Sequence, residues 1–368
     1  MDVKWIKGSR KEAKVQFFEG VEIMSVLKDY LNVFELPVGF TTRPARMEDA
    51  EMVVKMYTTY AEDLGGVERH QVSDTLAEWS LPTTNLDQDT LLVFAPDGSL
   101  AGYSEFWDIT EPYVRKNLWY RIHPDFKDLG IELYLIAWAE DKARLAVHRA
   151  PQGARVTLQG HSHAVDKRMQ EVYASLGYVH IRTGLLMVID LNQPPTAPQW
   201  PAGIRVQSMV KGKDERRIIR AVYDSFSDHW GFVPEPFEAY LERYLHFMNQ
   251  NADLDPALWF MALDDNEVAG ISLCYQESHN DPQMGWVATL GVCRPWRKRG
   301  LGLALLQHSF CELYHLGKRQ VGLNVDADSL TGATRLYEKA GMRSDPAHAH
   351  LFYEKELRPG VELSLQHL

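Results

Sequence analysis

The second part of the chain alternates between apolar runs and amphipathic stretches. An apolar run at 286–292 (WVATLGV) predicts a buried strand, and apolar residues with helical spacing follow over 303–316. Another apolar run at 320–327 (QVGLNVDA) predicts a strand that leads to a helix ending within 331–342 (TGATRLYEKAGM). This alternation indicates an α/β fold, in which helices cover the faces of a sheet.

The same order of elements occurs twice along the chain. After residue 203 we expect strands at 204–210, 258–265 and 268–277 and helices around 216–226 and 237–249. Earlier we expect a helix around 49–63 and two strands, 91–98 and 100–109, on either side of an Asp97-Gly98 turn. YASLGY at 173–178 also matches YEKAGM at 337–342, with its tyrosine and its glycine each 164 positions before their counterparts. The pattern predicts a tandem repeat of one fold.

A proline-rich stretch separates the two copies. Residues 192–203 contain four prolines and few apolar side chains, which is typical of a linker. We therefore expect a first domain at 40–191, a second domain at 204–368 and an extension at 1–39. Within the extension, residues 11–34 have apolar spacing suited to a helix.

The loop between the strand at 286–292 and its helix has the composition of an anion-binding site. It contains Arg297, Gly300 and Gly302 in an R-x-x-G-x-G pattern. The glycines lack side chains that would keep an anion from the backbone, and amide N–H groups converge at the positive end of the helix dipole. Lys298 and Arg299 add charge, so the loop is expected to hold a pyrophosphate.

Strand, loop and helix together resemble motif A of the GNAT acetyltransferase superfamily. Tyr337, Gly341 and Met342 occupy the places of its motif B, at a distance that fits one helix and one strand. The resemblance covers 204–357, and a D-H-W-G segment after residue 227 resembles that of tandem acetyltransferases of the mycothiol synthase type. It implies two tandem GNAT domains, each a mixed, mostly antiparallel sheet flanked by helices, with acetyl-CoA as the co-substrate.

The resemblance also implies roles for single residues. The strand end at 290–292 would pair with pantetheine through its backbone, and Tyr337 would give a proton to the CoA thiolate, since a phenol stays protonated at neutral pH. Ser329 stands where relatives carry an asparagine. The expected cofactor contacts are Leu290, Gly291, Val292, Arg297, Lys298, Arg299, Gly300, Leu301, Gly302, Asn324 and Ser329.

The general base does not follow from the resemblance. Many members carry a glutamate on the fourth strand, where this chain has Ala288 and Thr289. His229 has a suitable unperturbed pKa for a base, and Asp228, Trp230 and Glu235 are the expected acceptor contacts. Two alternatives remain open: a loop that packs its aromatic residues and leaves His229 in solvent, and a neutral amine whose proton leaves through water.

The first copy has lost the features of the phosphate loop. Lys127 replaces the arginine, Asp128 enters the loop and Glu132 stands where the second glycine would be. A carboxylate in contact with a pyrophosphate costs on the order of a few kcal/mol near a protein surface. We expect the first domain to be degenerate, although Gly130 leaves open an acetyl-CoA bound in a shifted pose.

Charge and composition narrow the function classes. A net charge of −11 argues against a general nucleic-acid surface. No apolar run is long enough to span a bilayer and no signal peptide is evident, so we expect a cytoplasmic protein without a membrane partner. Three cysteines without C-x-x-C spacing predict no metal site. The sequence leaves the oligomeric state open.

The function expected from these features is acetyl transfer from acetyl-CoA to a small-molecule amine by direct attack, with the chemistry in the C-terminal domain. The alternative is a non-catalytic acyl-CoA sensor or scaffold, which the missing glutamate favours. A dinucleotide-binding oxidoreductase fits less well, because no acidic residue follows the loop in the ribose-binding manner.

Overall fold

The structure is a computed structural model that describes residues 34–66, 70–250, 254–278, 281–329 and 332–364. The helix predicted at 11–34 therefore lies outside the described residues, apart from Phe34. No helix among the described residues is long and apolar enough to cross a membrane.

The two halves contain the same succession of elements, which confirms the predicted repeat. The first half consists of β1 (Thr41–Arg43), α2 (Ala50–Asp63), α3 (Val72–Trp79), α4 (Leu86–Asp89), β2 (Thr90–Phe94), β3 (Leu100–Trp107), β4 (Arg115–Ile122), α5 (Ile131–Leu145), β5 (Val156–His163), α6 (Lys167–Ser175) and β6 (Val179–Asp190). The second consists of β7 (Ile204–Ser208), α7 (Glu215–Phe226), α8 (Phe237–Gln250), β8 (Trp259–Asp264), β9 (Glu267–Tyr275), β10 (Met284–Val292), α9 (Leu301–His315), β11 (Gln320–Asp326), α10 (Ala333–Lys339) and β12 (Arg343–Arg358). Short 3-10 turns precede α5 and α9 at equivalent places.

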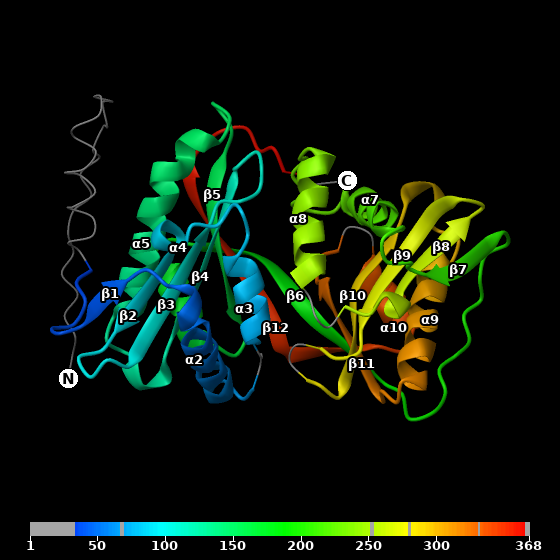
Figure 1. The fold of residues 1–368 in the computed structure, drawn as a ribbon, viewed down its shortest axis with the longest axis horizontal. Helices are drawn as coiled ribbons and strands as arrows, with labels where there is room; N and C mark the ends of the chain where they lie inside the picture. Colours follow the sequence, from blue (N-terminus) through cyan, green and yellow to red (C-terminus); the bar gives the residue numbers. More distant parts are fainter. Residues whose placement is uncertain (1–33, 67–69, 251–253, 279–280, 330–331, 365–368) are drawn as a thin grey trace.

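The strands of the described residues form one sheet of 12 strands, in the order β1-β2-β3-β4-β5-β12-β6-β11-β10-β9-β8-β7. Most neighbours are antiparallel, but β4 pairs with β5, and β10 with β11, in parallel. The last strand of each half lies beside the other half: β6 pairs with β11, and β12 pairs with β5. Figure 1 shows β6 and β12 running between the two lobes. The repeats are thus consecutive in sequence but exchange their final strands in space.

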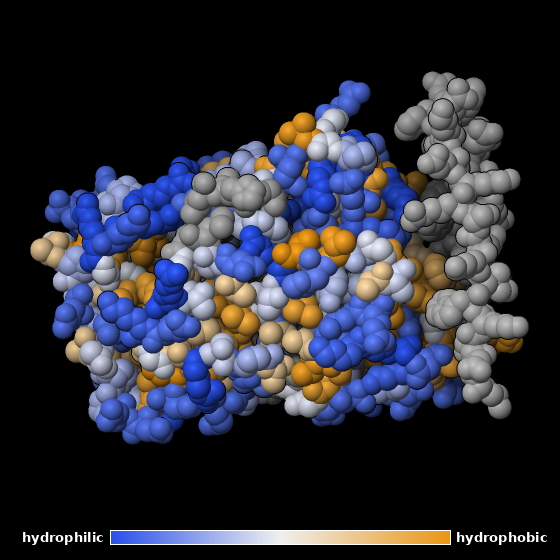
Figure 2. Space-filling model, turned by 180° about the vertical axis from the view of Figure 1, so that it is seen from behind, coloured by the Kyte–Doolittle hydropathy of each residue, from blue (hydrophilic) through white to orange (hydrophobic). Residues whose placement is uncertain are grey.

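Helices cover both faces of the sheet because their apolar residues recur every three or four positions. In the second half, Leu306, Phe310 and Leu313 of α9 pack in one buried cluster with Val287 and Val321. On the other face, α7 and α8 enclose a separate cluster against β8 and β9. The face in Figure 2 is largely hydrophilic, with apolar side chains in scattered groups, which agrees with large apolar residues filling the interior.

Candidate functional site

The centre of the second half contains an opening between two parallel strands. The ladder between β10 and β11 runs from the pair Met284 and Gln320 to the pair Trp286 and Gly322. Among the described residues, β10 pairs beyond Trp286 with β9 alone, and β11 with β6. Ala288 and Asn324 lie within these central strands and are nevertheless exposed. The two strands therefore diverge and leave a V-shaped gap, which the predicted strand end 290–292 borders.

A β-bulge distinguishes β10 from its counterpart. Val287 pairs with Cys274 and Thr289 with Leu273, so Ala288 is the extra residue. The described β3–β4 ladder in the first half runs from Gly102 to Trp107 without such a shift. A bulge bends its strand and adds twist, and this one lies just beyond the last residue of β10 that pairs with β11. No residue type in β10 marks the bulge in advance.

The loop at the end of β10 has an open conformation. Lys298 has a φ of 61° and Gly300, the N-cap of α9, has a φ of 84°. Lys298, Arg299 and Gly300 are exposed, as an anion-binding loop requires. Leu301 is buried in the core, so it offers a ligand only its backbone. A Cβ added at Gly302 would lie 3.0 Å from Leu336 Cδ1, so the bare backbone there is a close fit.

Arg297 points inward and joins this loop to the end of α7. Its Nε donates to the Val292 carbonyl at 2.9 Å, one Nη donates to the Ser225 carbonyl at 2.8 Å, and both Nη atoms bind the Asp228 carboxylate. Arg294 Nε donates to Asp228 at 3.1 Å. Burial alone would raise the pKa of Asp228, but the two guanidinium groups lower it below its usual value. This carboxylate, an expected acceptor contact, is already bound to two arginines.

The segment after Asp228 lies between the two halves. His229 packs on Phe226 with ring centroids 4.5 Å apart, and burial lowers the pKa of its imidazole. The Trp230 ring faces the guanidinium groups of Arg115 and Arg182. His229 is half-buried. It therefore differs from the alternative considered from the sequence, in which the His229 ring lies in solvent.

Glu235, the other acidic residue expected to meet the acceptor, is also paired. Arg243 donates to its two carboxylate oxygens at 2.9 and 2.7 Å. The Glu235 side chain is only 6% exposed. Its contact with an acceptor stays a prediction, and the salt bridge is the interaction it makes in this structure.

Tyr337 lies on α10 beside the core that α9 forms with β11. The side chain is 8% exposed, and burial raises the pKa of its phenol to about 12, so it is protonated at neutral pH. Its first-half counterpart, Tyr173, is 1% exposed and fills the space over Gly160, where an added Cβ would collide with the Tyr173 hydroxyl. Tyr173 therefore fills the space over the sheet in the first half, and Tyr337 has Asn324 in the position that corresponds to Gly160.

Asn324 lies within β11, in the part that no longer pairs with β10, and Ser329 follows the end of that strand. Asn324 is exposed in mid-strand, and the Ser329 amide donates to the Asp326 carbonyl at 3.0 Å. Helix α10 begins at Ala333 with Gly332 as its N-cap, so Ser329 does not cap that helix.

The first-half loop keeps the same backbone conformation but is closed by ion pairs. Asp128 and Gly130 have φ values of 69° and 76°, close to those found 170 positions later. Arg168 of α6 binds the carboxylates of both Asp128 and Glu132, and Lys127 binds Asp63. Aligning the two tyrosines places Gly332 opposite Arg168, so the second half has no side chain there.

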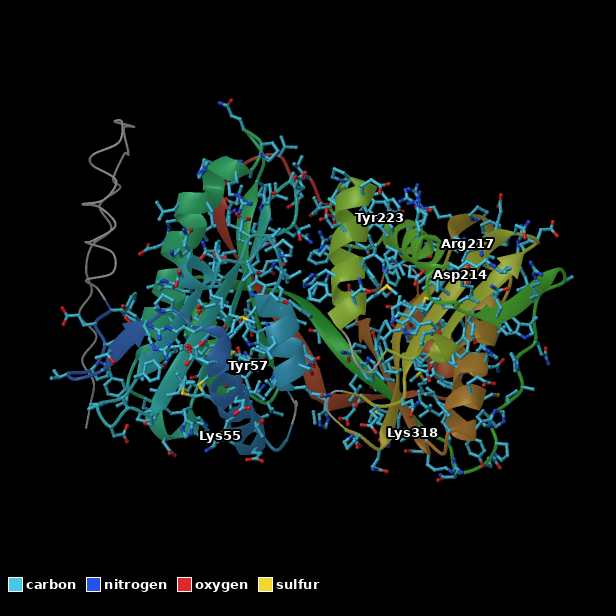
Figure 3. The ribbon with its side chains drawn as sticks, viewed as in Figure 1. Lys55, Tyr57, Asp214, Arg217, Tyr223 and Lys318 are labelled. Carbon is cyan, nitrogen blue, oxygen red and sulfur yellow. The ribbon has the colours of Figure 1, made fainter. Side chains whose placement is uncertain are left out.

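A cavity of about 980 Å³ lies between the halves, lined by residues of both. The second half contributes Trp286, Asn324 and Phe247 to its wall. On the first-half side, aromatic and acidic side chains line it, namely Tyr57, Trp107, Trp119, Asp74, Glu78 and Glu105. Figure 3 labels Tyr57 on α2 in that lobe and Tyr223 on α7 in the other. The cavity thus reaches from the β10–β11 gap to the first half.

Two acidic residues in this wall differ in environment. The Glu105 carboxylate accepts hydrogen bonds from Trp79 Nε1 at 2.6 Å, Trp107 Nε1 at 2.9 Å and the Tyr103 hydroxyl. Glu78 is half-buried, and its side-chain carboxylate makes no hydrogen bond or ion pair with the described residues. Burial, then the charges of Glu105 and Asp74, raise the pKa of Glu78 to about 8.

Sequence reasoning did not single out Glu78, which lines the cavity, or Tyr244. Tyr244 of α8 lies beside Thr289 at the bulge, and its pKa is raised by burial. The recurrence of Tyr240, Tyr244 and Phe247 on one helix face was the available signal. The histidines and acids of the described residues form no group of three that could hold a metal ion.

Known proteins resemble this chain in sequence and in overall fold. The Acetyltransferase (GNAT) family model matches residues 219–342. Mycothiol acetyltransferase of Thermobispora bispora is 30% identical over 60% of this chain and 70% of its own. A GCN5-related N-acetyltransferase from Sphaerobacter thermophilus, of solved structure, is 35% identical over 89% of this chain and 99% of its own, with a TM-score of 0.71. The chain belongs to the GNAT acetyltransferase superfamily. As a GNAT protein it is an N-acetyltransferase.

Two further proteins resemble this chain, one in sequence and one in fold. The mycothiol acetyltransferase of Saccharopolyspora erythraea is 28% identical over 66% of this GNAT chain and 78% of its own. A tandem GNAT protein from the clavulanic acid biosynthesis pathway is 17% identical and covers 87% of this chain and 99% of its own, with a TM-score of 0.65. At that identity the likeness concerns the fold alone, and it agrees with two tandem GNAT units.

Proposed function

We propose that this protein transfers an acetyl group from acetyl-CoA to a small-molecule amine in the cytoplasm, with the chemistry in the second half. One observation carries the proposal: the gap, the bulge and an open phosphate loop occur together in the second half, whereas ion pairs and Tyr173 close the equivalent places in the first.

The residues of the second half fit acetyl-CoA, which supplies an activated thioester. Backbone N–H groups of the loop at 298–302 and the start of α9 would bind the pyrophosphate, helped by Lys298 and Arg299. Gly302 supports this fit because any Cβ there would narrow the loop against Leu336. Backbone groups of 290–292 that point away from β9, together with the Asn324 amide, would orient the pantetheine. Arg297 contributes mainly by fixing the loop to Asp228.

Two side chains are suited to proton transfer. His229 is neutral at pH 7 because burial lowers the pKa of its imidazole, so it can accept the proton of the attacking amine. Tyr337 stays protonated and can donate to the leaving thiolate. If His229 is the base, the rate should fall on the acid side at a pH below the usual histidine pKa of about 6.5.

The acceptor would bind in the cavity between the halves. Its walls combine aromatic rings with the carboxylates of Asp74 and Glu105, and aromatic faces and carboxylates both attract ammonium groups. Arg343, the one lysine or arginine among the described lining residues, is itself paired with Asp190. These features favour a positively charged amine.

The test is CoA release from acetyl-CoA in the presence of a panel of mono-, di- and polyamines, amino sugars and cysteinyl amines. Tyr337→Phe keeps the ring and its packing, and should lower kcat about 100-fold with little change in KM, the usual size of a lost general acid. Thermal melting of the variant controls for folding. Acetyl-CoA binding without CoA release for any amine would support the alternative, an acyl-CoA sensor.

A further inference from the structure

Trp230 of the D-H-W-G segment is held by two arginines of the first half. The guanidinium of Arg182 lies 4.5 Å from the centre of the Trp230 ring, and that of Arg115 lies 5.2 Å from it. Arg115 belongs to β4 and Arg182 to β6, the strand that the first half places beside β11. Both cations therefore reach the segment across the boundary between the halves.

Arg182 connects the ring to the end of β11. It forms ion pairs with Asp328 at 3.3 Å and with Asp326 at 3.8 Å, and its side chain is 14% exposed. Its buried Nε has no hydrogen-bond partner among the described residues. The planar group is thus held by stacking and charge, which suits arginine and not lysine.

Arg115 fixes the backbone next to the ring. One Nη donates to the Gly231 carbonyl, and the other donates to Ser364 Oγ at 2.8 Å. Gly231 has a φ of 80°, and a Cβ there would lie 2.5 Å from Arg115 Nη1. A glycine is therefore required for this approach.

The same segment is held at its other end by the phosphate loop, through the contact between Asp228 and Arg297. His229 lies between the two attachments, and Asp326 adds to the field around its imidazole. We propose that Arg115 and Arg182 are positioning residues for the second half's site: the first half holds Trp230 and Gly231, and thereby places His229 at the gap. This role rests on the proposed function.

The experiment compares Arg182→Gln, Arg182→Lys and Arg115→Gln in the full chain by hydrogen exchange and kinetics. The amides of His229 and Phe232 donate to the carbonyls of Phe226 and His229, so their exchange reports on the segment. Both glutamine variants should speed exchange in 227–232 at least tenfold and lower kcat at least tenfold, with KM for acetyl-CoA changed less than threefold. Arg182→Lys should recover part of each effect.

Arg319→Gln is the matched control, because its guanidinium also stacks on a ring, that of Tyr314, 4.1 Å away, and bonds backbone carbonyls. It should leave exchange in 227–232 and kcat unchanged. Unchanged exchange in the Arg182 and Arg115 variants, or an equal rise in exchange over the whole chain, would overturn the proposal. A wild-type protein without acetyl transfer would refute the proposed function, while the exchange result would still decide whether the arginines hold the segment.

Discussion

Individual charged residues of the second half have partners that their sequence positions do not indicate. Arg297 fits an anion-binding pattern and Asp228 lies in a segment expected to meet the acceptor, yet the two side chains bind each other. The pattern located the loop correctly, but the partner of each charge depends on how α7 approaches β10. Gly291 permits that approach, since a Cβ there would lie 2.8 Å from Ser225 Cβ.

Removing the Asp228 charge tests the importance of this link. Asp228→Asn should lower the free energy of unfolding by about 2–3 kcal/mol at pH 7, because two guanidinium groups lose a buried anionic partner. The pKa of Asp228 is lowered, so its contribution is complete above the unfolded pKa of about 3.9 and is lost as the pH falls through the lower folded value. Urea denaturation at pH 7 and pH 3 measures both effects.

Asp224→Asn provides the comparison, since Asp224 forms an exposed pair with Arg220. Its effect should stay below about 1 kcal/mol at either pH. If Asp228→Asn has no larger effect than this control, Asp228 does not hold the loop.

Glu78 should destabilise the fold as the pH rises. The pKa of Glu78 is about 8 in the folded state, which exceeds its value in the unfolded state. At pH values between these two pKa values the unfolded chain releases the proton more readily, so the unfolded state is stabilised relative to the folded state. Glu78→Gln should therefore match the wild-type Tm at pH 4 and exceed it at pH 8 by at least about 2 °C. Scanning calorimetry at both values checks this, and equal Tm values at pH 8 would show that Glu78 ionises normally.

At the scale of helices and strands, periodicity predicted most elements. The expected helices at 216–226, 237–249 and 303–316 correspond to α7, α8 and α9 within two residues at each end, because each has one apolar face. The bulge at Ala288 could not be predicted, since it depends on the register between β9 and β10 rather than on the residues of β10 alone.

Deleting Ala288 tests the function of the bulge. The deletion should restore a regular β9–β10 ladder and change the free energy of unfolding by less than about 2 kcal/mol. It should weaken acetyl-CoA binding at least 100-fold, because the loss of the bulge would change the course of β10 along the gap. Ala288→Gly keeps the bulge and should bind within threefold of wild type. Titration calorimetry measures the affinity of both variants for acetyl-CoA. Wild-type affinity in the deletion variant would disprove the role of the bulge.

At the scale of the whole molecule, the two halves form one sheet because each places its last strand, β6 or β12, beside a strand of the other half. The sequence predicted two copies and a linker, but β5 and β11 each pair in antiparallel fashion with the last strand of the other copy. Local pattern therefore does not decide which strand pairs with which. The exchange places Arg182 beside Asp326, and residues of both halves line the cavity, so the proposed site draws on both halves although its loop at 297–302 belongs to the second alone.

Titration of CoA into the full chain decides whether only one of the two halves binds CoA or both do. We expect one CoA per chain, the same in Glu132→Gly, because Tyr173 and Arg168 still close the first half. Gly302→Glu should abolish binding, since its side chain would enter the loop and its carboxylate would repel the pyrophosphate. Two CoA molecules per chain, or binding that survives Gly302→Glu, would contradict the assignment of acetyl transfer to the second half.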